Sequence, residues 1–367
     1  MYGAERVILT LARHIGREEF DVTIVALQGP EGKSEKFTRN AAAMGIDVQP
    51  VTVKGRLDFN AMLEVRNILR ERSIRILHSH DFKSNFYGLV ASIGLPVARL
   101  VTAHGSTRDS FLKRAYLLLD EKVSYRFFDR IIAVSDRLRG ELEQKGVSRR
   151  KIEVISNAID LSLMVSDRKG SGDLECKRRG GEHYVFGVIG RLYPDKGHRF
   201  FLEAFARLAK DYPFVTAMIV GDGPEKFDIS HLVTRLGLGG KVDLCGERED
   251  MDVVYHGLDA VVIPSLREGL PYVLLESMAL KIPVIGTAVG DIPTLVRDGE
   301  TGWLVPPGVT DAIEKGMREL IASPEKARQM AERGCDAVNR QCSPRTMIER
   351  VESVYRQVIS NEGSSAR

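Results

Sequence analysis

Short apolar runs rich in β-branched residues alternate with amphipathic segments along most of the chain. In residues 59–73 and 135–146 the apolar side chains recur at the spacing of a helix, whereas the runs between such segments have the length of buried strands. This alternation predicts parallel sheets covered by helices. In the first half we predict strands at residues 21–27, 48–53, 74–80, 99–104, 130–135 and 151–156.

A charged, Gly-rich stretch at residues 162–183 interrupts this pattern and has little periodicity. We interpret it as a linker or an exposed loop. The strand–helix alternation then restarts, which predicts a second doubly wound domain, as a chain of 367 residues is too long for one ordinary core. Its predicted strands are residues 184–191, 215–223, 242–246, 260–265, 283–288 and 303–306.

The fold class that follows is α/β, with two Rossmann-like doubly wound domains. We place the N-terminal domain at residues 1–165, the linker at 166–183, the C-terminal domain at 184–343 and a terminal helix at 344–367. Ligands of such sheets bind outside the carboxyl ends of the strands, and the cleft between two domains is the usual place for a site. The terminal helix has its apolar residues at Met347, Ile348, Val351, Val354, Tyr355 and Val358.

The composition narrows the class of protein. Hydrophobic residues make up 43% of the chain, which is typical of soluble globular proteins. No apolar run approaches the ~20 residues that span a bilayer, and the N-terminus carries no secretory signal pattern. The cysteines have neither CxxC nor metal-site spacing, as expected of reduced thiols in a cytosolic protein. They are Cys176, Cys245, Cys335 and Cys342.

The net charge of +3 is unevenly distributed. Residues 1–160 carry a net charge of +6, and residues 161–367 a net charge of −3. A basic N-terminal half could face an anionic membrane or an anionic acceptor, and ordinary scatter is an equally good interpretation. No basic-aromatic motif typical of nucleic-acid binding is present.

Two carboxylates, Glu268 and Glu276, stand eight residues apart in the most informative stretch, residues 262–308. Glu268 lies in a turn before Pro271, and the apolar spacing that follows places Glu276 near the second turn of a helix. At ~1.5 Å per residue the carboxylates would be roughly 10–12 Å apart, about the span from the sugar to the ribose of a nucleotide-sugar. A diphosphate between them would meet the N-terminus of the helix, which favours anions.

In the context PSLREGLPYVLLE, this pair resembles the E-x7-E signature of retaining glycosyltransferases of the GT-B fold, family four. The resemblance implies that Glu268 contacts sugar hydroxyls and that Glu276 binds the ribose. Gly269 and Leu270 belong to the same donor-binding turn. The alternative is a surface helix with two solvated glutamates.

A second motif, GVIGRLYPDKG, places Gly190, Arg191 and Lys196 after a predicted strand and before a helix. Arginine binds phosphate oxygens bidentately, and lysine adds a compact charge. The motif resembles the GRL-x3-KG sequence whose Arg and Lys hold the donor diphosphate in the same family. Fixed cations and the lack of a DxD pair at a strand end predict no metal site and no cofactor beyond the nucleotide-sugar co-substrate. The alternative is a solvated loop.

Three further loops of the second domain resemble donor-binding segments of the family. The loop after residues 215–220 resembles a G-x-GP turn of the family. The loop after residues 242–246 resembles the one that contacts the nucleotide base. The loop after residues 283–288 resembles the one that closes on the donor through backbone N–H groups. For individual residues a purely structural role is nearly as good an interpretation. The residues concerned are Gly221, Gly223, Gly246, Arg248, Gly290 and Asp291.

In the first domain, His104 ends a predicted strand and resembles a histidine near the sugar's C6 hydroxyl in relatives, a structural histidine being the alternative. We assign Gly3, His80 and Asp81 to the acceptor side. His78 and His80 are expected on opposite faces of their strand, which argues against joint metal binding. The segment SNAID, which contains Asn157, resembles the hinge turn between the two domains in the family.

Two segments carry less specific signals. Residues 108–130 hold six Lys/Arg and five aromatic residues, which suits either a membrane-surface helix or, with slightly better support, an amphipathic core helix. Relatives open with an apolar strand before the Gly-rich loop, whereas MYGAERV begins inside that loop. We therefore expect a strand upstream of residue 1, whose loss would leave backbone groups unpaired.

The resemblance implies a retaining hexosyltransferase that moves a sugar from a nucleoside-diphosphate sugar to a hydroxyl acceptor in cell-surface polysaccharide or glycolipid assembly. The expected acceptor is lipid-linked or an oligosaccharide, bound by the N-terminal domain. The expected location is the cytoplasm, with a peripheral contact at the inner face of the membrane. The alternative outside the enzymes is a non-catalytic protein that binds a nucleotide-sugar. No Schiff-base lysine motif supports a phosphorylase.

Overall fold

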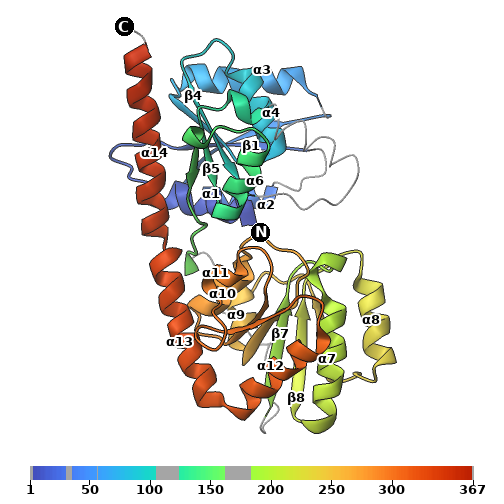
Figure 1. Cartoon of the computed structure of the whole chain (residues 1–367). Helices are drawn as coiled ribbons and strands as arrows, with labels where there is room; N and C mark the ends of the chain where they lie inside the picture. The colour runs from blue at the N-terminus through green and yellow to red at the C-terminus, as the bar shows by residue number, and fades with distance from the viewer. Residues whose placement is uncertain (1–2, 30–34, 56, 105–123, 162–182, 366–367) are drawn as a thin grey trace. The chain divides into compact units, whose positions relative to one another are not determined.

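Two compact units make up the chain in the computed structural model, which describes residues 3–29, 35–55, 57–104, 124–161 and 183–365 (Figure 1). Unit 1 comprises Met1–Ala158 and Pro344–Arg367, and unit 2 comprises Ile159–Ser343. The boundary between the units lies before residue 165, at residues 158–159. The predicted linker, apart from residue 183, and residues 108–123 of the basic aromatic segment lie outside the described residues.

Unit 1 alternates strands with helices, and each of the six strands predicted in the first half forms within two residues of its expected bounds. The elements are α1 (Gly3–His14), β1 (Thr23–Gln28), α2 (Glu35–Ala43), β2 (Asp47–Thr52), α3 (Phe59–Glu71), β3 (Ile76–Ser79), α4 (Phe82–Ala91), β4 (Ala98–Ala103), η1 (Ser124–Phe127), β5 (Arg130–Ala133), α6 (Asp136–Gln144), η2 (Arg149–Lys151), β6 (Ile152–Val154) and α14 (Pro344–Ser365).

The strands of unit 1 form two parallel sheets. β1 pairs with β2, and a second sheet has the order β3-β4-β5-β6. One apolar cluster nevertheless joins both sheets, because Val51 of β2 and Leu77 of β3 pack on α3 and α4 through residues such as Val65 and Tyr87. The expectation of a further strand upstream of residue 1 stays a prediction.

The terminal helix α14 groups with unit 1, where it packs against α1 and β4 (Figure 1). Its apolar stripe faces the core, since all six apolar residues at helical spacing are at most 7% exposed. Burial of this stripe explains why the pattern predicted a helix from about residue 344. The six residues are Met347, Ile348, Val351, Val354, Tyr355 and Val358.

Unit 2 repeats the alternation, and all six strands predicted for it form. Its elements are β7 (Tyr184–Ile189), η4 (Pro194–Lys196), α7 (His198–Asp211), β8 (Val215–Val220), α8 (Lys226–Arg235), β9 (Val242–Gly246), α9 (Met251–His256), β10 (Ala260–Ile263), α10 (Tyr272–Ala279), β11 (Val284–Thr287), α11 (Ile292–Leu295), β12 (Trp303–Val305), α12 (Thr310–Ala322) and α13 (Pro324–Gln341).

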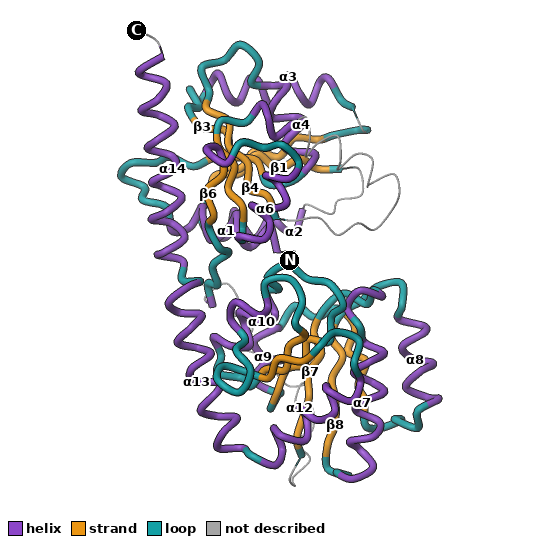
Figure 2. Tube along the Cα trace, viewed as in Figure 1, coloured by secondary structure: helices purple, strands orange, loops and turns teal. Residues whose placement is uncertain are grey.

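The sheet of unit 2 is parallel throughout, with the order β12-β11-β10-β7-β8-β9. Successive side chains of β7 alternate between two cores: Phe186 and Val188 pack with α7, α8 and α12, and Val185 and Ile189 pack with α9, α10 and α11. Helices therefore cover both faces of the sheet (Figure 2). This is the doubly wound α/β fold that the alternation predicted.

Candidate functional site

The strand order of unit 2 reverses between β7 and β10, which pair directly although β8 and β9 lie between them in the chain. Ligands of doubly wound sheets bind at the carboxyl ends of the strands beside such a reversal. Arg191 and Lys196 follow β7, and Glu268 follows β10. The two motifs singled out in the sequence therefore meet at the point where this fold binds its ligands.

The loops after β7 and β8 approach so closely that only glycine fits. A Cβ on Gly221 would lie 1.9 Å from the carbonyl oxygen of Gly190, and one on Gly223 would lie 2.4 Å from that of Leu192. The amide of Leu192 donates a 2.9 Å hydrogen bond to the carbonyl of Asp222. Gly221 and Gly223 thus permit contact between two loops, in addition to the turn predicted for them.

The loop after β11 packs in the same way on the turn that carries Glu268. Gly290 has φ of +57°, and a Cβ there would lie 2.2 Å from the carbonyl oxygen of Glu268. The next amide, of Asp291, donates to the carbonyl of Gly269 at 3.0 Å, and Asp291 itself is buried. The predicted donor-side residues Gly269, Gly290 and Asp291 are therefore brought together with Glu268.

Lys196 and Glu268 form an ion pair at the centre of these loops. The Lys196 ammonium lies 2.5 Å from Oε1 of Glu268, and the two side chains are 17% and 10% exposed. The hydroxyl of Ser265 donates to the same carboxylate oxygen at 2.9 Å. A largely buried, paired lysine can bind an anion on its remaining N–H donors while it holds the carboxylate in place.

Glu276 lies in the second turn of α10, as predicted, and Pro271 occupies the N-cap of this helix. The side chain is 3% exposed, and its Oε2 accepts a hydrogen bond from the hydroxyl of Tyr255 on α9. Tyr255 was not identified from the sequence, because it lies 21 positions before Glu276 and no repeat in the sequence signals this contact.

The two arginines of the predicted site differ in their surroundings. The Arg191 guanidinium lies 4.7 Å from the centroid of the Tyr193 ring. Arg248, expected to flank a base, forms a forked pair with Asp250 at 2.8 and 2.6 Å. Gly246 ends β9 with φ of +66°, which re-directs the chain toward this pair, and Leu270 packs against a core face of unit 2.

His198, which the sequence analysis did not single out, is the first residue of α7 and is 1% exposed. Neither ring nitrogen has a hydrogen-bond partner among the described residues. Burial and, to a smaller extent, the nearby Lys196 charge lower its pKa to about 4. His198 is therefore neutral at pH 7 and adds no charge beside Lys196.

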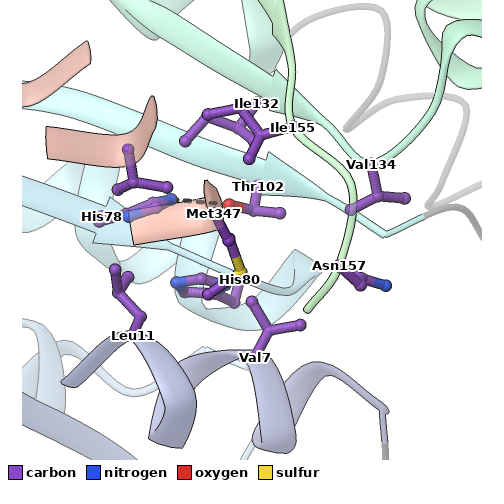
Figure 3. Close-up of a pocket in the computed structure, with 11 residues that line it drawn as sticks. Val7, Leu11, His78, His80, Thr102, Ile132, Val134, Ile155, Asn157 and Met347 are labelled. Carbon is purple, nitrogen blue, oxygen red and sulfur yellow. Dashed lines mark hydrogen bonds between the residues drawn. The ribbon is translucent and has the colours of Figure 1, made fainter. Parts of the chain in front are cut away.

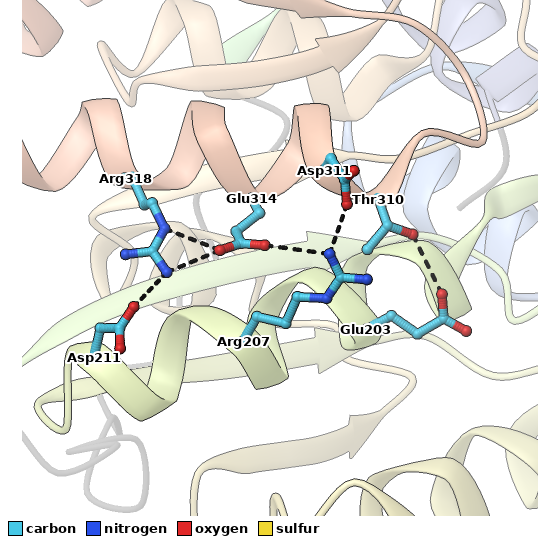
Figure 4. A network of polar contacts seen from close by, with 7 residues as sticks. All are labelled: Glu203, Arg207, Asp211, Thr310, Asp311, Glu314 and Arg318. Atoms are coloured by element: carbon cyan, nitrogen blue, oxygen red, sulfur yellow. Dashed lines mark hydrogen bonds and ion pairs between the residues drawn. The ribbon is translucent and has the colours of Figure 1, made fainter.

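Helix α7, which starts directly after the Lys196 turn, is fixed to α12 by a polar network (Figure 4). Arg207 of α7 contacts Asp311 and Glu314 of α12 at 2.6 and 3.7 Å. Arg318 of α12 bridges Glu314 and Asp211 at 2.8 and 2.6 Å. Networks of this kind limit the motion of the helix even where each exposed pair contributes little to stability.

In unit 1, three of the four predicted site residues follow the ends of β3 and β4. His104 follows β4, and its Nε2 lies 3.3 Å from Nδ1 of His80. Asp81 accepts a hydrogen bond from the amide of Ser84 and caps α4, and Gly3 is the first residue of α1. Asp81 thus has a structural role that accounts for its position.

The expectation that His78 and His80 point to opposite faces was wrong. Their ring centroids lie 4.3 Å apart, because residues two apart on an extended chain share a face. Both rings line a small pocket that is close to the minimum size for a single water molecule (Figure 3). Its other polar lining residues are Thr102 and Asn157.

The described residues contain no cluster of three or more His, Cys, Asp or Glu side chains with the geometry of a metal site. Independence of metal stays a prediction. None of the described helices combines the length and the apolar character that crossing a bilayer requires.

Family models match both halves of the chain: Glycosyl transferases group 1 matches residues 176–336, and Glycosyltransferase Family 4 matches residues 1–163. The chain belongs to the family 4 glycosyltransferases of the GT-B fold. The family predicted from the E-x7-E and GRL-x3-KG motifs is therefore confirmed, as is its class of enzyme, a glycosyltransferase of the hexosyltransferase type.

Relatives of this glycosyltransferase cover most of its length. It is 26% identical over 83% of its chain to 80% of an Escherichia coli UDP-Gal:alpha-D-GlcNAc-diphosphoundecaprenol alpha-1,3-galactosyltransferase. It is also 26% identical over 80% of its chain to 80% of the alpha-D-kanosaminyltransferase of Streptomyces kanamyceticus. The structure of Anabaena Alr3699/HepE in complex with UDP and glucose has a TM-score of 0.83 at 21% identity, covering 97% of this chain and 96% of that one. This last likeness confirms the GT-B fold.

Proposed function

We propose that this glycosyltransferase moves a hexosyl group from a nucleoside-diphosphate sugar, first of all a UDP-sugar, to a hydroxyl of a lipid-linked or oligosaccharide acceptor in cell-surface polysaccharide or glycolipid assembly. The E. coli relative is named for a UDP-sugar and a diphosphoundecaprenol acceptor, and HepE was solved with UDP and glucose. Unit 2 binds the donor, and unit 1 binds the acceptor.

The observation that carries this proposal is the meeting of Lys196 and Glu268 at the strand-order reversal of unit 2. In the bound state, Arg191 and Lys196 neutralise the donor diphosphate. Glu268 orients the sugar hydroxyls, and Glu276, held by Tyr255, accepts hydrogen bonds from the ribose. One carboxylate thus serves the sugar, the two cations serve the diphosphate, and the other carboxylate serves the ribose. This is the order of the three groups along a nucleotide-sugar.

The chemistry requires that the bond between the anomeric carbon and the diphosphate oxygen breaks, with its electron pair passing to the diphosphate. The acceptor oxygen forms the new bond to that carbon, and its proton passes to the leaving phosphate. Arg191 and Lys196 stabilise the charge that develops on the diphosphate. Attack from the face that the diphosphate leaves retains the anomeric configuration, and no described side chain is placed as a covalent nucleophile.

Metal is not required in this scheme, since side-chain cations meet the diphosphate charge. The enzyme acts in the cytoplasm, with a peripheral contact at the inner face of the membrane where a lipid-linked acceptor is available. Nucleic acid has no part in this function.

The test is a transfer reaction with UDP-galactose, UDP-glucose or GDP-mannose and a short-chain diphosphate-linked sugar acceptor. We expect a new glycosidic product whose anomeric proton, read by NMR coupling, keeps the donor's configuration. Nucleotide binding without any product would favour the non-catalytic alternative. A product of inverted configuration would contradict retention but not transfer.

A further inference from the structure

Three imidazole rings follow one another at the carboxyl edge of the unit 1 sheet. The centroids of His78 and His80 are 4.3 Å apart with their planes tilted by 33°, and those of His80 and His104 are 5.5 Å apart and tilted by 29°. The family resemblance places His104 near a sugar hydroxyl, but it gives no such contact for His78 or His80. The other two rings therefore need an explanation.

His78 anchors this row of rings within the core. Its Nδ1 lies 2.7 Å from the Tyr355 hydroxyl on α14, and its Nε2 lies 2.8 Å from Oγ1 of Thr102 on β4. Both nitrogens are thus occupied, so the His78 ring has a fixed orientation. Because the His80 ring packs against it with 4.3 Å between the centroids, the His80 ring is held as well.

In the part of the chain that the structure describes, the His80 ring has one hydrogen-bond partner, Nε2 of His104 at 3.3 Å from its Nδ1. Its remaining surroundings are largely apolar, with Val7 and Leu11 of α1 and Met347 of α14 lining the same pocket (Figure 3). The His80–His104 hydrogen bond is therefore the polar interaction that accounts for a histidine at position 80.

This bond has a consequence for His104. Burial lowers the pKa of His104 to about 4 and that of His80 well below its usual range, so both rings are neutral at pH 7. A neutral imidazole has one N–H donor and one acceptor nitrogen. Once Nε2 of His104 is engaged by His80, Nδ1 is, among the described residues, the nitrogen left for a ligand, and its protonation state is set by the bond on the other side.

We propose that His80 is a positioning residue, which through Nε2 of His104 fixes the ring orientation and tautomer with which Nδ1 of His104 meets a substrate hydroxyl. The proposal rests on the proposed function, because it assumes that His104 contacts a substrate.

Two amide substitutions separate positioning from mere space-filling. In His80→Asn the amide replaces Nδ1 on Cγ, so it can still reach Nε2 of His104. In His80→Gln the amide sits one carbon further out, and His80→Leu removes the polar group. We expect His80→Asn to stay within about threefold of the unaltered kcat, while the Gln and Leu variants lose about tenfold or more, since small misplacements of a reacting group are costly. The dissociation constant for UDP should not change in any of them, since unit 2 binds the nucleotide.

A second readout does not depend on turnover. Nitrogen-15 NMR of histidine-labelled protein should give one dominant tautomer for His104 in the unaltered chain and in His80→Asn. It should give a mixture in His80→Leu, and circular dichroism identifies any variant that fails to fold.

Several outcomes would overturn the proposal. Full kcat in His80→Leu, equal losses in the Asn and Gln variants, or an unchanged His104 tautomer each contradict positioning. Normal activity in His104→Ala would show that the reaction does not need His104, so His80 would have nothing to position. An unaltered chain that binds UDP but transfers no sugar overturns the proposed function as well, whereas the other results leave that function standing.

Discussion

The ammonium of Lys196 lies 2.5 Å from a carboxylate oxygen of Glu268, although 72 positions separate the two residues in the chain. One follows β7 and the other follows β10, the two strands at which the sheet order reverses. Both side chains are largely buried. The pair therefore links the two motifs that the proposed function assigns to the diphosphate and to the sugar.

Because removing one partner leaves the other charge buried, Lys196→Met should lower the free energy of unfolding of unit 2 by about 3 kcal/mol. Adding Glu268→Gln should recover part of this loss, with a coupling of about 1–3 kcal/mol between the two changes. The single tryptophan of the chain, Trp303 on β12 of unit 2, reports this transition by fluorescence in a urea titration.

Lys210→Ala is the matched control, since it removes the same charge from an exposed position at the far end of α7. It should change stability by less than about 0.5 kcal/mol. Strictly additive effects of the Lys196 and Glu268 substitutions would show that the ion pair does not contribute to stability.

Glu276→Gln should weaken the binding of free UDP by about tenfold or more, because a hydrogen bond to a charged group is lost at the ribose. The glutamine oxygen can still accept from Tyr255, so the core around α9 and α10 is kept. Glu268→Gln should lower turnover with little effect on UDP affinity. Titration calorimetry with UDP alone measures both effects. A larger loss of UDP affinity in Glu268→Gln than in Glu276→Gln would mean that the ribose and sugar roles of the two glutamates are exchanged.

Periodicity was sufficient to predict the elements of this fold. All twelve strands and the buried stripe of α14 follow from apolar spacing, because each element buries one side or both sides in a pattern that repeats along the chain. The place of Glu276 in α10 followed for the same reason.

Side-chain pairings across loops could not be predicted in this way. The Tyr255–Glu276 hydrogen bond and the Arg248–Asp250 pair depend on loop conformation, which no repeat encodes. The contact between the His78 and His80 rings was within reach of sequence reasoning, since positions two apart on a strand share a face, and the prediction misapplied that rule.

Chelation should leave activity intact, because Arg191 and Lys196 already supply positive charge to the diphosphate. We expect protein treated with EDTA to release UDP from its donor sugar at the untreated rate. Loss of activity that magnesium or manganese restores would contradict metal independence.

Unit 1 should lose stability as the pH falls from about 6.5 toward 4. Burial lowers the pKa of His78 to about 3 and that of His104 to about 4, whereas an unfolded histidine titrates near 6.5. In this range the unfolded state binds more protons than the folded state, so acid favours unfolding. The thermal midpoint, followed by tyrosine circular dichroism, should drop by several degrees between pH 7 and pH 5.

Substituting one buried histidine should flatten this dependence. In His80→Asn one titrating ring is absent, so the slope of stability against pH should be smaller than in the unaltered chain. A midpoint that does not vary between pH 7 and pH 5 would mean that the three rings titrate as exposed groups do.

Release of UDP from a UDP-sugar is the most direct test of the central claim, that unit 2 activates a nucleotide-sugar through its two cations. With acceptor present, the unaltered chain and Lys210→Ala should release UDP at the same rate. Arg191→Ala should be slower by about 10²–10³, the usual loss when one stabilising group is removed from a developing charge. No release from any UDP- or GDP-sugar, or an Arg191→Ala rate equal to that of the unaltered chain, would contradict the account.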